Sequence, residues 1–259
     1  TGCVTGGDTH AAADIICYMN GYNDPRRPEY FIPSEFEGFE YAGIRIRIEK
    51  PALNSVGRKY SGVNISPSDP LVWMNAAEVA FLKAEAKAVF DFNMGAGSAE
   101  EFYNEGVRLS LEQHNVAGYE AYIMDDTSRP ASYIDPAGLN NYSSVLSDVT
   151  IKWDEGAPVE KKQERIITQK WIANFNNGNE AWADYRRTNY PALMPASDAG
   201  NKSDGLVSSE FGARRMKYPL AEYTNNGENV NAAVSQHLGG PDRMSTRLWW
   251  DCNPAIVIK

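Results

Sequence analysis

Cysteine and histidine are scarce in this 259-residue chain, which has only three of each. The cysteines are Cys3, Cys17 and Cys252. They form no C-x-x-C pair, so the sequence indicates neither a zinc site nor a disulfide framework, although Cys3 and Cys252 could still meet in space. The histidines are His10, His114 and His237. They are far apart in the sequence, and none has a carboxylate at metal-ligand spacing. We therefore expect no bound metal and no cofactor.

Several other features are missing, and each absence excludes a class of protein. No apolar run approaches the roughly 20 residues that span a bilayer, and no signal peptide is recognisable. The chain contains no P-loop, no H-E-x-x-H motif and no G-x-S-x-G esterase motif. Acidic residues outnumber basic ones by 34 to 25, and this net charge of -9 argues against a nucleic-acid partner.

Apolar side chains recur at helical spacing in several stretches, so the predicted fold class is mainly α. The expected helices span residues 8–22, 69–90, 98–116, 119–125, 158–175 and 230–238. Asp8 and Asp69 are expected N-caps, and Ser98 with Glu101 forms a capping box. The 69–90 helix, expected to be the longest, has a stripe of alanines that allows close approach. Residues 70–118 therefore predict a tetratricopeptide-like αα-hairpin.

An irregular segment of many prolines and aromatic rings, residues 25–69, separates the first two helices. Residues 43–48 alternate like a strand, as residues 214–218 do near the other end of the chain. Long loops are often functional, and exposed rings can stack on sugars. The candidate ligand-binding residues are Tyr30, Phe36, Phe39 and Tyr41, with Glu40, Arg45 and Arg47 available to bond hydroxyl groups. Alternatively, these rings cover the helical core.

Residues 179–191 combine charge with aromatic rings on a helix that must end before Pro191. The residues that define this stretch are Glu180, Trp182, Asp184, Arg186 and Arg187. The two carboxylates could act as the acid/base pair of a glycoside hydrolase. We favour a structural ion network, because adjacent arginines keep carboxylates ionised and poor at donating protons. Arg187 is then expected to pair with Glu180 or Asp184.

The C-terminal pair of tryptophans, Trp249 and Trp250, has two interpretations. The rings could stack on a sugar, or they could plug the core. We favour the plug, because both rings would bury large apolar areas there.

Several landmarks occur in a characteristic order along the chain. They are Asn23-Asp24-Pro25-Arg26 with Tyr30-Phe31, the helix 73–86, Ile167–Trp171, the E-A-W…Y-R-R-T-x-Y-P block at 180–191, Gly239–Asp242 and Leu248–Asp251. Together they resemble the SusD/RagB family of nutrient-binding outer-membrane lipoproteins, in its SusD-like branch. Because family proteins are about twice as long, we expect this chain to be a C-terminal portion that lacks the lipid anchor.

The resemblance implies a SusD-like α/α superhelix with tetratricopeptide-like helix pairs, long irregular loops and a few short strands. It implies non-enzymatic binding of a glycan or other nutrient at the cell surface, for delivery to a TonB-dependent outer-membrane transporter. The alternative is a protein-interaction module that contacts the transporter or a peptide cargo and has no sugar affinity. Within this portion we expect an aromatic loop segment (25–69), the αα-hairpin (70–118), signature helices (158–191) and a loop with a C-terminal cap (192–259).

Overall fold

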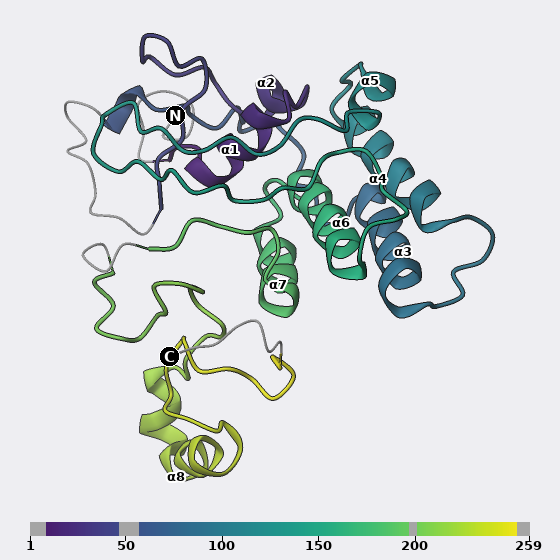
Figure 1. Cartoon of the computed structure of the whole chain (residues 1–259). Helices are drawn as coiled ribbons and strands as arrows, with labels where there is room; N and C mark the ends of the chain where they lie inside the picture. Colours follow the sequence, from purple (N-terminus) through teal and green to yellow (C-terminus); the bar gives the residue numbers. More distant parts are fainter. Residues whose placement is uncertain (1–8, 47–56, 197–200, 253–259) are drawn as a thin grey trace. The chain divides into compact units, whose positions relative to one another are not determined.

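The computed structural model describes residues 9–46, 57–196 and 201–252, whose regular secondary structure is almost entirely helical, with long irregular segments between the helices (Figure 1). The described residues contain isolated β-bridges and no extended sheet. Two compact units divide the chain. The larger one holds the described residues up to Trp182 together with 190–193, and the smaller one holds 183–189 and those from Met194 onward. The predicted mainly α fold is confirmed.

The helices of Figure 1 are mostly those expected from the sequence. Their bounds are α1 Ala13–Gly21, α2 Arg27–Tyr30, α3 Ala76–Phe90, α4 Ala99–Gln113, α5 Tyr119–Ile123, α6 Val159–Ala173, α7 Gly178–Thr188 and α8 Leu220–His237, with a short 3-10 turn at Gly57–Lys59. Helix α8 spans 18 residues, but a kink at the non-helical Asn226 divides it into two pieces. The longest uninterrupted helices in the described parts of the chain are α3, α4 and α6, with 15 residues each, so the helix ending at Phe90 shares this length with two others.

The predicted αα-hairpin is α3 packed against α4. The capping box at Ser98 and Glu101 is present, with the Glu101 amide donating to Ser98 Oγ at 3.0 Å. A Cβ on Gly106 would lie 2.7 Å from the Phe81 ring, so the helices approach as closely as this glycine allows. The predicted start of α3 is wrong, because Asn75 is its N-cap, while the Asp69 carboxylate accepts from the Ser66 amide.

Helix α6 packs against α3 and α4 and completes the core of the larger unit. Ile166, Ile167 and Ile172 are fully buried on it. Lys170 is also buried, where its Nζ pairs with Glu78 of α3 at 3.1 Å. The inner face of α6 thus combines buried isoleucines with one lysine whose charge is paired.

A buried polar network joins the corner after α1 to three later helices. Arg26 is fully buried and pairs with Asp24, their side-chain atoms lying 2.5 Å apart. Its two terminal nitrogens also donate to Ser110 of α4 at 2.8 Å and to Gln169 of α6 at 2.9 Å. The Tyr122 hydroxyl of α5 donates to Asp24 at 2.7 Å. This network places one buried charge pair at the meeting point of four helical segments.

Three other expectations are corrected or lie outside the described residues. Residues 214–218 form no strand, because the Arg214 and Arg215 amides both donate to the Met244 carbonyl, at 2.7 and 3.2 Å, and no neighbouring strand pairs with this segment. In the 43–48 stretch, Ile44 makes one bridge with Ala12, and residues 47 and 48 are not described. Asp8, the expected N-cap of the first helix, and Cys3 also lie outside the described residues.

The two tryptophans near the C-terminus are exposed to solvent. Trp249 is 86% exposed and Trp250 is 36% exposed, so the interpretation of this pair as a core plug is wrong.

The two described cysteines form no disulfide. Cys17 and Cys252 are both free, the first buried and the second exposed. Burial and the nearby Asp14 raise the pKa of the Cys17 thiol to about 12, which keeps it protonated and unreactive at neutral pH.

Candidate functional site

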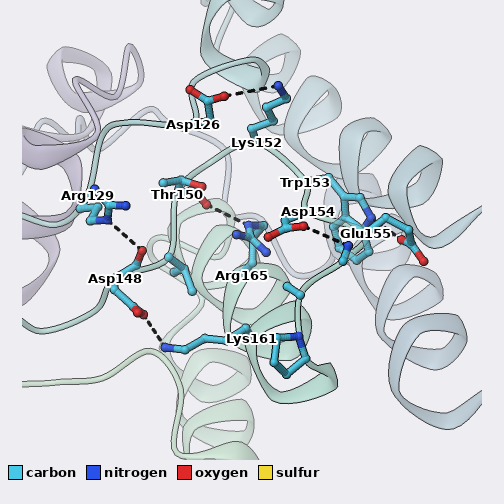
Figure 2. A pocket seen from close by; sticks show the side chains of 14 residues that line it. Asp126, Arg129, Asp148, Thr150, Lys152, Trp153, Asp154, Glu155, Lys161 and Arg165 are labelled. Atoms are coloured by element: carbon cyan, nitrogen blue, oxygen red, sulfur yellow. Dashed lines mark hydrogen bonds and ion pairs between the residues drawn. The ribbon is translucent and has the colours of Figure 1, made fainter.

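A charged pocket of about 630 Å³ lies in the larger unit, between the irregular segment 148–158 and the first half of α6 (Figure 2). Asp126 and Arg129, from the loop after α5, complete its lining. Its volume is within the usual range for a small-ligand site. The pocket lining contains both signs of charge together with Trp153, whose side chain is buried.

Side chains from other parts of the larger unit hold the pocket wall in place, although the wall itself has no regular secondary structure. The Val149 carbonyl accepts from the hydroxyl of Tyr22, directly after α1, at 2.9 Å, and the Ile151 carbonyl accepts from the Tyr103 hydroxyl of α4 at 2.5 Å. Between these two, the Thr150 carbonyl accepts from Arg165 Nε at 3.0 Å. Three consecutive carbonyls of the wall are thus fixed by hydrogen bonds from side chains.

Most of the acidic groups that line the pocket are neutralised by a lysine. Lys152 pairs with Asp126 at 3.4 Å, and Lys161 pairs with Asp148 (Figure 2). The hydrogen bond and charge of Lys161 lower the pKa of the Asp148 carboxyl below its ordinary value. The Glu155 pKa is also lowered, first by the hydrogen bond from the Trp153 indole and then by Lys162. These carboxylates stay ionised at neutral pH, which makes them poor general acids.

Unlike the lysines of the pocket, Arg165 is paired with no carboxylate among the described residues. Its side chain reaches the pocket from the middle of α6 and is only 5% exposed. Among the described residues, no hydrogen-bond acceptor lies within reach of its Nη1 atom, and no ion pair includes it. An arginine buried without a counter-charge is unusual, because burial removes the water that would stabilise the cation. Arg165 was not among the residues predicted from the sequence.

Arg129 is the second guanidinium group of the pocket. It donates to the backbone carbonyls of Asp148 at 3.1 Å and Thr127 at 3.3 Å. Helix α6, whose N-cap Pro158 offers no side-chain cap, begins at the same edge. The unbonded amides at a helix N-terminus favour negative charge. The available positive potential of the pocket therefore comes from Arg165, Arg129 and the start of α6.

The four rings predicted to bind ligand lie in a different part of the larger unit, and the structure divides them into two pairs. Tyr30 is 1% exposed and stacks on Phe175 with ring centroids 4.5 Å apart. Tyr41 is 6% exposed, and the Arg27 guanidinium lies over its ring. Phe36 and Phe39 are half-buried, and the Phe36 ring packs edge-on against Tyr60. A binding role for these rings stays a prediction, which only Phe36 and Phe39 could serve by direct contact.

The polar residues around the predicted signature behave as a structural network. Arg187 donates to Asp184 Oδ1 from Nη2 at 2.7 Å and from Nε at 3.1 Å, so the predicted pairing is confirmed. Glu180 is exposed, and Trp182 is half-buried. In the smaller unit, the Arg186 guanidinium lies over the Trp250 ring, 5.3 Å from its centroid.

The Arg187–Asp184 pair supports a stability prediction. The Asp184 side chain is 7% exposed and the Arg187 side chain is 33% exposed, so the pair is only partly screened by water. We expect Arg187→Ala to lower the free energy of unfolding by about 1–2 kcal/mol, between the values for exposed and buried pairs. Urea denaturation measures this change. An unchanged free energy of unfolding would mean that water stabilises the Asp184 carboxylate as well as Arg187 does.

Two searches of the described residues give negative results. No group of three or more His, Cys, Asp or Glu side chains is arranged to hold a metal ion. No helix in the described parts of the chain is long and apolar enough to cross a membrane.

Comparison with known proteins gives the family. A family model of SusD and RagB outer membrane lipoproteins matches residues 3–251. The chain belongs to the SusD/RagB family. No curated relative matches the sequence.

Three solved SusD homologues show how far the likeness to this SusD-like chain extends. One from Bacteroides uniformis is 60% identical, with a TM-score of 0.92 over 96% of this chain and 51% of its own. One from Bacteroides thetaiotaomicron is 42% identical, with a TM-score of 0.85 over 93% of this chain and 52% of its own. A chitin-binding homologue from Flavobacterium johnsoniae is 42% identical, with a TM-score of 0.84 over 93% of this chain and 49% of its own. The chain therefore spans about half the length of these relatives, and its resemblance to the family is confirmed.

Proposed function

We propose that this SusD-like chain is part of a cell-surface lipoprotein that binds a glycan and delivers it to a TonB-dependent outer-membrane transporter. The observation that carries the proposal is family membership together with a relative, 42% identical over 93% of this chain, that is described as chitin-binding. The 630 Å³ pocket adds a concave, polar surface of suitable size. The transporter as partner rests on the family resemblance.

The proposed activity is binding without catalysis. A glycosidase needs one carboxyl group that is protonated and can donate to the leaving oxygen. Asp184 is instead held in an ion pair by Arg187, and Glu180 lies exposed on the same helix. In the pocket, the hydrogen bond and charge of Lys161 lower the pKa of the Asp148 carboxyl. These contacts favour a binding protein.

Affinity gel electrophoresis of the chain tests the proposed function. The gels would contain plant, host or microbial polysaccharides, with soluble chitin derivatives included because of the chitin-binding relative. We expect at least one polysaccharide to retard migration relative to bovine albumin. Capture of the transporter without retardation by any glycan would contradict the proposal and favour the protein-interaction module.

The aromatic-loop prediction has its own test in the same gels. The sequence predicts that Ala at Tyr30, Phe36, Phe39 and Tyr41 abolishes glycan binding, but two of these rings are buried and their loss would disturb packing. We therefore expect Phe36→Ala with Phe39→Ala to reduce retardation several-fold, because each half-buried ring would lose its contact with the sugar. Leu139→Ala, which also removes an exposed apolar side chain, is the control. Unchanged retardation of the double variant would remove these rings from the site.

A further inference from the structure

We propose that the Arg165 pocket binds an anionic group of the glycan, either the carboxylate of a uronic acid or a sulfate ester. This inference rests on the proposed function, because it specifies the chemical class of the ligand. Two observations carry it: a buried guanidinium group without a counter-charge, and the cavity into which this group faces (Figure 2).

The hydrogen-bonding state of Arg165 determines what it can bind. Its Nε atom donates to the Thr150 carbonyl at 3.0 Å, which orients the plane of the guanidinium group. Its Nη1 atom is buried and has no acceptor among the described residues. A guanidinium group presents a planar set of donors that matches a carboxylate or a sulfate. An oxyanion in the pocket would supply both the missing acceptor and the missing counter-charge.

The rest of the pocket is consistent with one anionic group. Arg129 lies on the same lining, and α6 begins at its edge without a side-chain cap. The lysines do not contribute in the same way, because Lys152 and Lys161 are already paired with Asp126 and Asp148. Trp153 also lines the pocket but is only 5% exposed, so the charged groups, and not a stacking ring, specify the site.

Asp154 is the one acidic group of the pocket lining that no described ion pair includes, and its Oδ1 atom accepts from the Gly156 amide at 3.0 Å. Because this carboxylate is exposed, solvent screens it, and it does not cancel a guanidinium group buried within the pocket.

The experiment compares glycans that share a backbone and differ in charge. The carboxylate comparison uses polygalacturonan against its fully methyl-esterified form. The sulfate comparison uses a sulfated galactan against its desulfated form. We expect the charged member of at least one pair to be bound at least about tenfold more tightly, because hydrogen bonds to charged groups are the strong ones. The pair that discriminates identifies the anionic group.

Variants assign the preference to the pocket. Arg165→Gln and Arg129→Gln should each reduce the preference for the charged glycan about tenfold or more, with neutral glycans unaffected. Arg165→Lys should recover little, because a lysine cannot make the bidentate contact. Arg108→Gln is the matched control, since Arg108 lies on α4, outside the pocket, in an exposed pair with Glu112. If Arg165→Gln does not fold, the exposed Arg129→Gln and the salt dependence of wild-type binding decide the question.

The outcomes separate this inference from the proposed function. Equal affinity for both members of each pair, or an unchanged preference in the Arg165 and Arg129 variants, would overturn the anion site and leave glycan binding standing. Binding of no polysaccharide would contradict the proposed function. In that case titration of wild-type chain and Arg165→Gln with galacturonate and inorganic sulfate tests the pocket directly, and identical responses would overturn it.

Discussion

Replacing Arg26 by Met is expected to lower the free energy of unfolding by about 3–5 kcal/mol. The substitution keeps most of the side-chain volume and removes the charge. Asp24 would then remain fully buried with no cation beside it, and Ser110 and Gln169 would each lose a donor. The loss would exceed that for most surface substitutions, because a buried ion that loses its partner cannot be solvated.

Urea denaturation followed by circular dichroism measures this change, with Arg108→Met as the matched control. Arg108 is 41% exposed and pairs with Glu112 on the same helix, so its loss should change stability by only about 0.5 kcal/mol. Adding Asp24→Asn to Arg26→Met should recover part of the loss, because the unpaired charge is then removed. Equal effects at Arg26 and Arg108 would contradict the role assigned to the buried network.

Replacing Phe81 by Ala is expected to lower the free energy of unfolding by about 3–5 kcal/mol as well. Phe81 is fully buried in the α3–α4 hairpin, where its ring contacts Tyr103 and faces Gly106. Truncation leaves a cavity that two packed helices can close only in part. Leu82→Ala, at a neighbouring position that is 45% exposed, should cost under about 1 kcal/mol.

The contact between Phe81 and Gly106 can be isolated by a double-mutant cycle. Gly106→Val alone should destabilise by about 1–3 kcal/mol, because its Cβ would lie 2.7 Å from the Phe81 ring. In the Phe81→Ala background the same valine should fill part of the cavity, so the two losses should fall short of additive by about 1 kcal/mol or more. Additive losses would show that the ring and the glycine do not limit the approach of the helices.

Local rules predicted helix α4 well and misplaced the start of α3. The side chains of Ser98 and Glu101 each accept a hydrogen bond from the other residue's backbone amide. Because both residues lie within one helical turn, this cap needs no contact with a distant part of the chain. Asp69 is an equally good N-cap residue, but its carboxylate closes a turn with the Ser66 amide instead. Asn75 became the cap, and its side-chain amide also bonds Asn174 at 2.8 Å, a contact 99 positions away. Sequence reasoning could not weigh that contact.

The aromatic segment and the pocket both depend on contacts that no local pattern contains. Tyr30 is buried because Phe175 lies against it from the end of α6. Arg165 was missed because the sequence shows only a helix with charges at its start. One signal was available: Lys161 and Arg165 are four positions apart and so lie on one face of the helix. That spacing indicates a basic face, but not that Lys161 is neutralised while Arg165 is left without a counter-charge.

The side chains that hold the 148–151 carbonyls also determine how much order a ligand would have to impose. Tyr22, directly after α1, Tyr103 of α4 and Arg165 of α6 immobilise this backbone before anything binds. Association is weakened when a loop must lose conformational entropy to form its contacts, and a preformed wall avoids most of that loss. A Tyr22→Phe change, at a side chain outside the pocket lining, would make this backbone more mobile. Affinity would then fall mainly through entropy, while every contact with the ligand remained available.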